Sequence, residues 1–324
     1  MRPCTCDQVT GPVYSNDQCR RCWKWHYDPI YRSKLSPQPP VEWTPTRRLI
    51  EDAILLAAKL PPYVSAIAGI PRSGMMVASA IATHLHLPLY CLPYGGKLQP
   101  AGSGGRAGFG WAGVPDGPIV VIDDTVYMGT AMARARQQMG ARSALFAAVY
   151  VTPWTLDKVD FYTRTLPSIQ LLEWNIFNNG LMRGTSADNT YRGGCATDMD
   201  GILCEEPTAP DSDTEGYERF LREAKPRWLP RALAIPLIVT GRLEKYRAVT
   251  EEWLSKWGVR YDRLIMSPAR SWQERGDIAQ MKAAAYAGSQ CGFFFESDPD
   301  QAARIFAAVK RPVICPPAER VWMT

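Results

Sequence analysis

Two adjacent carboxylates, Asp123 and Asp124, follow a β-branched run that begins after Pro118. The run has the length and composition of a strand that is buried on both faces. A turn containing Gly129 and an Ala/Met/Arg-rich segment, 130–139, come next, and that segment should be helical. At such a junction backbone N–H groups and the helix dipole can hold a phosphate, while the carboxylates accept hydrogen bonds from sugar hydroxyls. The plain alternative is a buried strand whose acids cap the following helix.

A second anion-binding turn is predicted upstream of this acidic pair. A short buried strand over 65–70 leads into a helix over 75–85, and glycines lie on both sides of Arg72 and Ser73 in the turn between them. Such a turn lets backbone N–H groups and a guanidinium converge on one anion. Alone this turn is a weak signal, and the acidic pair downstream makes it a strong one.

A third candidate site lies in the C-terminal part of the chain. Asp198 and Asp200 form a D-x-D-G motif after a predicted strand, and two carboxylates at this spacing suit a nucleophile and an acid/base that share a magnesium ion. A strand over 236–242 brings Thr240 to its end, and a strand over 293–295 ends in acids. Because the carboxyl ends of parallel strands meet at one edge of a sheet, we expect one site there.

Four cysteines crowd into the start of the chain with the spacing C-x-C-x12-C-x2-C: Cys4, Cys6, Cys19 and Cys22. Four thiolates in two pairs can complete a tetrahedral zinc shell, and so short a segment needs such a staple to fold. Basic and aromatic residues flank the second pair, which leaves two interpretations open. One is a nucleic-acid or polyanion contact; the other, which we favour, is a structural zinc knuckle that packs on the next domain.

The bulk composition limits the class of protein. A chain of 324 residues with 46% apolar and 21% charged residues is globular and long enough for two domains. It contains no apolar run of membrane-spanning length, and its first residues lack the apolar core of a signal peptide, so we expect a cytoplasmic enzyme. The net charge of +5 suits anionic substrates but is too small by itself to indicate nucleic acid.

Alternating strands and helices should position the motifs. After an extended Pro-rich linker, a helix capped by Thr44 or Thr46 should bury one face, formed by Leu49, Ala53, Leu56 and Leu60. Further strands are expected over 89–92 and 144–152, and the segment 169–177 should end the first domain. The alternation predicts an α/β fold with two doubly wound parallel-sheet domains over 41–190 and 191–324, preceded by the cysteine segment and linker over 1–40.

A glycine-rich stretch over 94–113 carries Lys97 and Arg106. Structureless loops of this length are usually lids or disordered segments. The two basic residues are therefore either part of a lid or ordinary surface charges.

The strand, acidic pair and turn resemble the PRPP-binding motif of type I phosphoribosyltransferases. The resemblance implies that Asp123 and Asp124 meet the ribose hydroxyls of magnesium-bound PRPP. It further implies that Arg72 and Ser73 hold the pyrophosphate, that Lys97 and Arg106 shield it, and that a loop wraps the 5-phosphate: Val126, Tyr127, Met128, Gly129 and Thr130. Tyr127 and Met128 stand where that family usually has small or hydroxylated residues, so we expect backbone contacts there.

The C-terminal motifs resemble the haloacid dehalogenase (HAD) phosphatase superfamily. By that resemblance Asp198 attacks phosphorus, Asp200 is the acid/base, Thr240 binds the phosphate and Lys282 stabilises it, with Lys245 and Lys256 as competing lysines. Magnesium would be held by Asp198, Asp200, Glu296 and Asp298, with Asp300 as the alternative to Asp298. The segment after Leu203 has room for about one helix, 214–224, and lacks a large cap, which suits a phosphate on a large molecule.

Together, the halves predict a two-step enzyme. The first step transfers 5-phosphoribosyl from PRPP to an acceptor, with a glycan hydroxyl expected, and releases pyrophosphate; the second hydrolyses the 5-phosphate and leaves a ribofuranosyl unit. The tandem, with the segment Glu173-Trp174-Asn175 at the join, resembles two-domain bacterial proteins of polysaccharide biosynthesis. Two alternatives stay open: a nucleobase phosphoribosyltransferase with a nucleotidase, and a PRPP-sensing regulator that binds nucleic acid through the cysteine segment. The acceptor-activating base and the oligomeric state, for which a homodimer is a candidate, stay open too.

Overall fold

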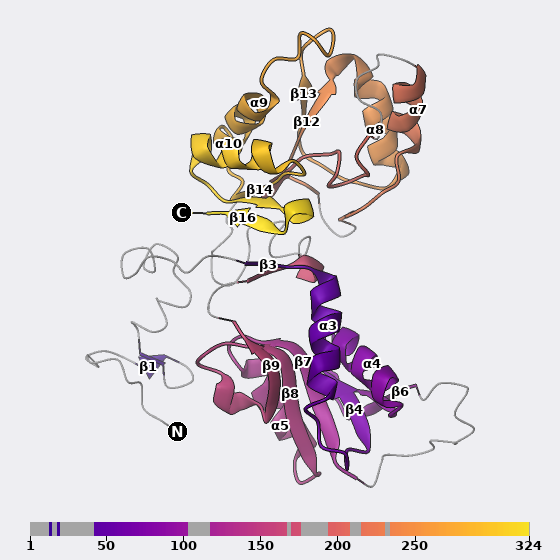
Figure 1. The fold of residues 1–324 in the computed structure, drawn as a ribbon, viewed down its shortest axis with the longest axis vertical. Helices are drawn as coiled ribbons and strands as arrows, with labels where there is room; N and C mark the ends of the chain where they lie inside the picture. The colour runs from indigo at the N-terminus through magenta and orange to yellow at the C-terminus, as the bar shows by residue number, and fades with distance from the viewer. Residues whose placement is uncertain are drawn as a thin grey trace. The chain divides into compact units, whose positions relative to one another are not determined.

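The computed structural model describes residues 13–14, 18–19, 42–102, 117–166, 170–175, 194–207, 215–230 and 234–323. The chain divides into two compact units, Thr44–Trp174 and Asn175–Thr324, the second including Met1–Trp43. Each unit contains a six-stranded sheet (Figure 1). The predicted domain boundary after residue 190 lies outside the described residues, so this boundary remains a prediction.

The sheet of the first unit has the strand order β6-β5-β4-β7-β8-β9. Its strands are β4 (Ala66–Gly69), β5 (Leu89–Cys91), β6 (Gln99–Gly102), β7 (Ile119–Val126), β8 (Ala144–Val151) and β9 (Phe161–Thr165). All neighbours pair in parallel except β6, which runs antiparallel to β5. The prediction of a purely parallel sheet was therefore wrong at this edge. Part of the predicted loop over 94–113 is the edge strand β6, which pairs the backbone groups that β5 would otherwise leave open.

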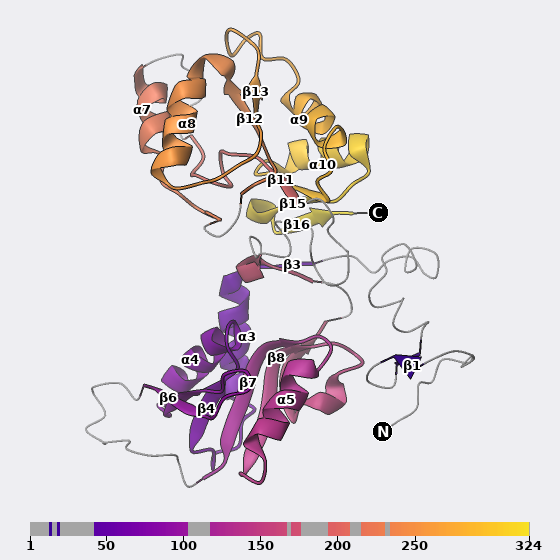
Figure 2. The ribbon, with the colours of Figure 1, turned by 180° about the vertical axis from the view of Figure 1, so that it is seen from behind.

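Helices cover both faces of this sheet (Figure 2). Val120 and Ile122 of β7 pack with α3 (Thr46–Ala57) and α4 (Gly74–Leu85) on one face. The residues between them on the strand, such as Val121, pack with α5 (Thr130–Met139) on the other face. This alternation follows from the two-residue period of a strand, and it explains why β7 is apolar at every position before its acids.

Helix α3 is joined to the sheet by an ion pair between a buried carboxylate and an exposed arginine, as well as by its apolar face. Asp52 on α3 is 1% exposed, accepts the hydroxyl of Tyr150 at 2.9 Å and pairs with Arg164 of β9 at 2.8 Å. The predicted cap at Thr44 or Thr46 was wrong, because Pro45 is the N-cap residue and offers no side-chain oxygen. Instead, the Thr46 N–H donates to Glu173 Oε2 at 2.6 Å.

The sheet of the second unit has the order β13-β12-β11-β14-β15-β16. Its strands are β11 (Cys195–Thr197), β12 (Leu237–Leu243), β13 (Leu264–Ser267), β14 (Phe293–Phe295), β15 (Val313–Cys315) and β16 (Arg320–Trp322). Five strands are parallel, and β16 pairs antiparallel with β15 at the edge. Because β12, β11 and β14 are neighbours, the residues at their carboxyl ends share one edge of the sheet.

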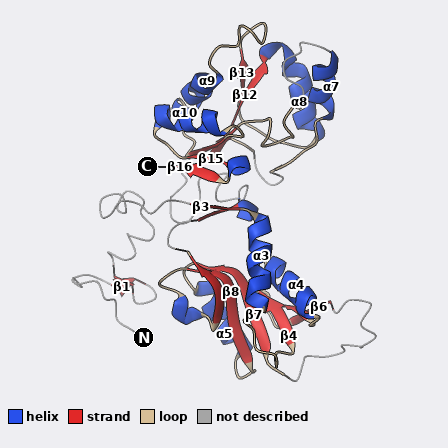
Figure 3. Cartoon of the chain, viewed as in Figure 1, coloured by secondary structure: helices blue, strands red, loops and turns tan. Residues whose placement is uncertain are grey.

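Two pairs of helices cover the two faces of this second sheet (Figure 3). Helices α9 (Ile278–Ala287) and α10 (Pro299–Val309) pack on one face around Phe294. Helices α7 (Glu215–Glu223) and α8 (Arg247–Lys256) pack on the other face with Leu243.

Shorter elements complete the described chain. They are the antiparallel pair β1 (Val13–Tyr14) and β2 (Gln18–Cys19), the strands β3 (Glu42–Thr44) and β10 (Gln170–Leu172), and four 3-10 turns over Leu156–Lys158, Glu173–Asn175, Glu244–Tyr246 and Pro316–Ala318. Among the helices described, none has the length and apolar content needed to cross a membrane.

Candidate active sites

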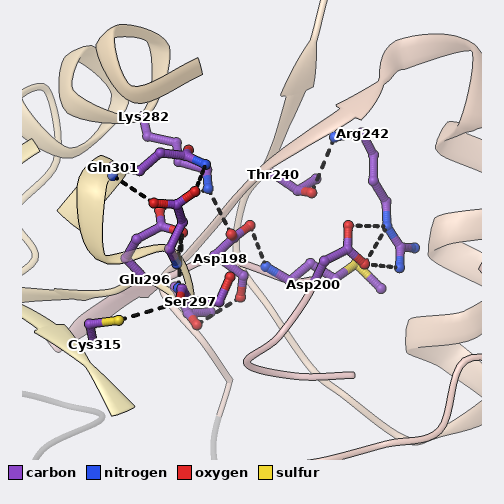
Figure 4. A network of polar contacts seen from close by, with 12 residues as sticks. Asp198, Asp200, Thr240, Arg242, Lys282, Glu296, Ser297, Gln301 and Cys315 are labelled. Carbon is purple, nitrogen blue, oxygen red and sulfur yellow. Dashed lines mark hydrogen bonds and ion pairs between the residues drawn. The ribbon is translucent and has the colours of Figure 1, made fainter. Parts of the chain in front are cut away.

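The second unit places a lysine between two carboxylates at the edge of its sheet (Figure 4). Asp198 directly follows β11, Glu296 directly follows β14, and Lys282 reaches both from α9. Lys282 Nζ lies 2.6 Å from Asp198 Oδ2 and 2.8 Å from Glu296 Oε2. The other oxygens accept backbone donors: Asp198 Oδ1 binds the Met199 N–H at 2.7 Å, and Glu296 Oε1 binds the Ser297 N–H at 2.9 Å. Each of the carboxylate oxygens of Asp198 and Glu296 is therefore oriented by a hydrogen bond.

Burial sets the charge balance of this cluster. Glu296 is 0% exposed, and burial first, then the charge of Asp198, raise its pKa to about 8, although Lys282 pulls it down. Burial by itself would lower the pKa of Lys282, but the charges of Asp198 and Glu296 outweigh burial and raise it. The lysine is therefore charged at neutral pH.

Asp200 points away from this cluster and pairs with Arg242 of β12. The guanidinium Nε lies 3.1 Å from both oxygens of Asp200, and Nη2 lies 2.5 Å from Oδ1. Arg242 is 1% exposed and also donates to Thr250 Oγ1 at 3.3 Å. Sequence reasoning selected Thr240 from this strand and missed the arginine, which lies two residues further along it.

The other predicted residues of this site differ in burial and in hydrogen bonding. Thr240 is fully buried, and its Oγ1 accepts the Arg242 N–H at 3.3 Å. Asp298 caps α10 by accepting the N–H groups of Asp300 at 2.8 Å and Gln301 at 3.0 Å. Burial pushes the pKa of Asp298 up, but these N–H donors outweigh burial and hold that pKa below its ordinary value. Asp300 is exposed in the first turn of α10.

The competing lysines lie elsewhere. Lys245 lies over the ring of Tyr246 at 5.0 Å, and Lys256 lies over the ring of Trp257 at 5.8 Å. Neither is among the residues that line the pocket described below.

No three or more His, Cys, Asp or Glu side chains are grouped to hold a metal ion anywhere in the described ranges. The four predicted magnesium ligands are thus not assembled as one cluster, because Asp200 faces Arg242 and Asp298 caps a helix. Asp198 and Glu296 nevertheless fit the ion. They are hydrogen-bonded carboxylates whose mutual repulsion a divalent cation would relieve, and magnesium is commonly bound by one or two carboxylates with water and phosphate oxygens.

The predicted zinc ligands cannot be placed. Cys4, Cys6 and Cys22 lie outside the described residues, and Cys19 is described only as the last residue of β2. Zinc binding therefore remains a prediction. Five other described cysteines are in no disulfide: Cys91, Cys195, Cys204, Cys291 and Cys315.

A pocket of about 300 Å³ opens beside the carboxylates of the second unit. Its lining includes Asp198, Asp200, Lys282 and Asp298, and residues that sequence reasoning missed: Glu206, Tyr217, Trp272, Arg275 and Gln301. Burial raises the pKa of Glu206 above its ordinary value, and a hydrogen bond with Ser297 opposes that shift. The glycine of D-x-D-G is required here, because Gly201 has φ +73° and a Cβ on it would collide with Glu206 and Ser297.

The acidic pair of the first unit lies within β7, not after it as predicted. Asp124 is 5% exposed, and both of its oxygens are engaged: Ser73 Oγ donates to Oδ1 at 2.7 Å and Trp174 Nε1 donates to Oδ2 at 2.9 Å. Asp123 Oδ1 accepts the Asp124 N–H at 3.0 Å. Burial first, and then the charge of Asp124, raise the pKa of Asp123 well above its ordinary value. Ser73 thus joins the acidic pair in space, and Trp174 is an addition that sequence reasoning assigned only to the domain join.

The turn before α4 approaches the acids closely. A Cβ on Gly74 would lie 2.9 Å from Ile122 O and 3.0 Å from Asp123 Oδ1, so only glycine allows the helix to begin against β7. Arg72 is exposed, and the peptide bond between Pro71 and Arg72 is cis. Lys97 is exposed before β6, and Arg106 lies outside the described residues.

The loop after β7 is braced through its carbonyl oxygens. Val126 O accepts Thr155 Oγ1 at 2.7 Å, and Tyr127 O accepts Trp154 Nε1 at 2.9 Å. In a trans peptide the N–H points opposite to the C=O, so the N–H groups of Tyr127 and Met128 point away from that bracing turn. Gly129 then takes φ +79° as the N-cap residue of α5. The loop thus leads into the N-terminus of α5, and N–H groups at a helix N-terminus can bind an anion.

Lys158 lies beside the same loop. Its Cγ would be 3.0 Å from a Cβ on Gly129, and its Nζ pairs with Asp157 at 3.2 Å. Nothing in its sequence context marked this lysine, because the contact depends on the turn after β8.

Three solved structures illustrate what the chain is similar to. A purine phosphoribosyltransferase from Pyrococcus horikoshii Ot3 is 21% identical with a TM-score of 0.32, over 41% of this chain and 92% of that chain. A xanthine-guanine-hypoxanthine phosphoribosyltransferase from Helicobacter pylori is 14% identical with a TM-score of 0.33, over 42% of this chain and 92% of that chain. An adenine phosphoribosyltransferase from Thermoanaerobacter pseudethanolicus ATCC 33223 is 14% identical with a TM-score of 0.28, over 39% of this chain and 80% of that chain. No family model and no curated protein matches the chain. Likenesses at this level assign neither a fold nor an activity to it.

Proposed function

We propose that the protein transfers 5-phosphoribosyl from PRPP to an acceptor and then removes the 5-phosphate. The observation that carries the first activity is Asp124, held between Ser73 and Trp174 shortly before the loop that leads into α5. The second activity is supported by Asp198, which Lys282 holds against Glu296 at the edge of a pocket.

In the transfer step, the bond between C1 of the ribose and the pyrophosphate oxygen breaks while the acceptor oxygen bonds to C1. Asp123 and Asp124 hold the ribose hydroxyls, the loop from Val126 to Thr130 holds the 5-phosphate, and Arg72 and Ser73 hold the departing pyrophosphate. These contacts stabilise an oxocarbenium-like transition state by fixing charge around both phosphate ends. The proton of the acceptor hydroxyl is lost to a base outside this set. Magnesium, when bound to PRPP, neutralises charge on the leaving pyrophosphate.

In the hydrolytic step, an Asp198 oxygen attacks phosphorus and the bond from phosphorus to the sugar O5 breaks. Asp200 gives its proton to that oxygen, so the sugar leaves as an alcohol and the phosphoryl group stays on Asp198. Asp200 then takes a proton from water, which attacks phosphorus, releases phosphate and restores Asp198. Lys282 keeps the nucleophile oriented, and a magnesium ion near Asp198 and Glu296 would neutralise phosphate charge.

A glycan hydroxyl is the acceptor we propose. Support comes from the resemblance of the tandem and from the segment between β11 and β12, where the described residues contain one helix, α7. A site with so small a covering element accepts a phosphate on a bulky molecule more readily than one closed by a large cap.

The experiment that tests the proposal incubates the protein with PRPP, magnesium and an acceptor panel of glycan fragments and nucleobases. Phosphorus NMR and mass spectrometry follow pyrophosphate and product. We expect a glycan that gains a ribosyl mass with the natural protein and a ribosyl-phosphate mass with Asp198→Asn. Asp124→Asn should abolish pyrophosphate release. Nucleotide formation from a base would contradict the glycan acceptor, and absence of pyrophosphate with every acceptor would contradict the transferase.

A further inference from the structure

The pocket of the second unit has a wall that the proposed chemistry does not use. Tyr217 of α7 and Trp272, which precedes α9, both line it. Tyr217 is 5% exposed, and the two rings meet edge to face with centroids 5.2 Å apart. Tyr217 Oη and Trp272 Nε1 are enclosed atoms without a hydrogen-bond partner in the described structure. Because a buried polar atom left unpaired costs free energy, this wall indicates a ligand that pairs with both.

A third unpaired atom lies on α10, which packs on the opposite face of the sheet from α7. Gln301 Oε1 is enclosed and also lacks a partner among the described residues, whereas Gln301 Nε2 donates to Asp298 Oδ2 at 3.4 Å. The pocket therefore offers an indole donor, a hydroxyl that donates or accepts, and an amide acceptor. Hydroxyl groups, which donate and accept, match such a mixed set.

Both aromatic rings have close neighbours. Phe220 stacks on Tyr217 at 6.1 Å, and Tyr246 meets the Tyr217 ring at 5.3 Å. The guanidinium of Arg275 lies over the Trp272 ring, 4.2 Å from its centroid. These contacts hold the two rings, and with them Tyr217 Oη and Trp272 Nε1, in place.

The side of the pocket formed by Tyr217 and Trp272 lies next to Asp200 and Thr240, the groups proposed to act on the phosphate. Arg275 Nη1 would lie 3.5 Å from a Cβ on Gly241, which places its charge at the carboxyl end of β12 next to Thr240. Burial first, and then the nearby charge of Asp200, raise the pKa of Tyr217, so its hydroxyl keeps its proton near the acid/base. A group that leaves from phosphorus toward Asp200 would therefore meet Tyr217.

We propose that Tyr217 and Trp272 bind the leaving group of the phosphatase while Arg275 binds the phosphate, and that the leaving group is a hydroxyl-bearing sugar. This inference rests on the proposed phosphatase function. The hydroxyls of the sugar pair with Tyr217 Oη and Trp272 Nε1, and Arg275 holds the phosphate end near β12.

The test measures binding by calorimetry, with magnesium present, on the full chain carrying Asp198→Asn so that no turnover occurs. The probes are ribose 5-phosphate and inorganic phosphate, and the readout is the ratio of their affinities. We expect ribose 5-phosphate to bind more tightly. Adding Tyr217→Phe or Trp272→Phe should lower the ratio by about tenfold, the effect of losing one hydrogen bond. Tyr246→Phe is the matched control, because Tyr246 belongs to the same aromatic cluster but does not line the pocket.

Three outcomes would overturn the inference. They are equal affinities for the two probes, an affinity ratio that neither Tyr217→Phe nor Trp272→Phe changes, and tighter binding of adenosine 5′-monophosphate than of ribose 5-phosphate. Hydrolysis of phenyl phosphate by the natural protein separately tests the phosphatase. If that hydrolysis is absent while the affinity ratio falls as expected, the phosphatase function fails and the sugar site stands.

Discussion

At the scale of single residues, Lys282 balances two buried carboxylates. Its side chain is 2% exposed and bonds to Asp198 and Glu296 at 2.6 and 2.8 Å. Lys282→Met keeps the length of the side chain but leaves both acids without their cation. We expect a loss of about 3–5 kcal/mol in the free energy of unfolding, as for other buried pairs that lose one partner. Urea denaturation checks the stability, and phosphate release from phenyl phosphate should fall at the same time.

Adding Glu296→Gln to Lys282→Met distinguishes the effect of the lysine on stability from its effect on phosphate release. The double variant removes, together with the lysine, an acidic side chain whose ionised form is disfavoured by burial, so it should recover part of the lost stability without recovering phosphate release. An equal free energy of unfolding for the natural protein and Lys282→Met would contradict the buried ionic cluster.

For Lys282 we expect one substitution to lower both stability and activity. For Asp123 we expect a substitution that raises stability but removes activity. Its pKa is raised by burial and by Asp124, so the fold disfavours its ionised form. The stabilising contribution of a group with a raised pKa is present at low pH and is lost as pH rises through the folded-state pKa. Asp123→Asn mimics the neutral form. Its melting temperature should therefore exceed that of the natural protein, by a margin that grows as pH rises above the usual carboxyl range, while PRPP-dependent pyrophosphate release is lost. A constant margin across pH would show that Asp123 does not titrate as described.

At the scale of elements, the sequence predicted which segments form helices and strands. It was less accurate about the positions of the motif residues within them. The helix over Thr130–Met139 was confirmed residue for residue, because Gly129 and Gly140 bound it. The strands β7 and β12, however, continue through the motif residues. Asp123 and Asp124 lie inside β7, and Thr240 lies inside β12. Strand pairing with β8 and β13 extends these elements past the point where composition changes, and pairing cannot be read from one segment alone.

The groups that sequence reasoning missed depend on contacts between distant segments. Trp174 reaches Asp124 across fifty positions of the chain, and Glu173 reaches Thr46 across 127 positions. The edge strand β6 was missed because Gln99-Pro100-Ala101-Gly102 has poor strand propensity and is held by its pairing with β5.

The 3-10 turn Glu173–Asn175 links helix α3 to the acidic pair. Glu173 accepts the Thr46 N–H, while the next residue, Trp174, donates to Asp124. Glu173→Ala should cost about 1 kcal/mol of stability through the lost helix cap, and it should raise the KM for PRPP because Trp174 loses its anchor. Chemical denaturation and steady-state kinetics measure the two effects.

A substitution at the N-cap position of α3 distinguishes the two roles of Glu173, which are to cap the helix and to hold the turn that carries Trp174. Pro45, the N-cap residue, has φ −71° and ψ 152°, a conformation that suits a capping serine. Pro45→Ser added to Glu173→Ala should restore the stability of α3 but leave the KM for PRPP high. Recovery of both by Pro45→Ser would mean that the turn acts only as a helix cap.

At the scale of the whole molecule, the two units have separate apolar cores. The first core packs Val120 and Val121 of β7 against helices on its two faces, and the second packs Phe294 and Leu243 in the same way. Domains with their own cores commonly unfold as separate cooperative units. We therefore expect two transitions in calorimetric unfolding of the full chain.

Ligands should assign these transitions, because a ligand stabilises only the unit that binds it. At about one hundred times its Kd, a ligand adds about 2.7 kcal/mol to the stability of that unit. Magnesium-PRPP without acceptor should raise one melting temperature, and inorganic phosphate should raise the other. Asp124→Asn should abolish the first shift and keep the second.

Asp200→Asn breaks the ion pair with Arg242 at the edge of the pocket. It should lower the melting temperature of the transition that inorganic phosphate raises and leave that of the PRPP-sensitive transition unchanged. A single transition that both ligands shift equally would mean that the units unfold together, and the two activities would then share one folding unit.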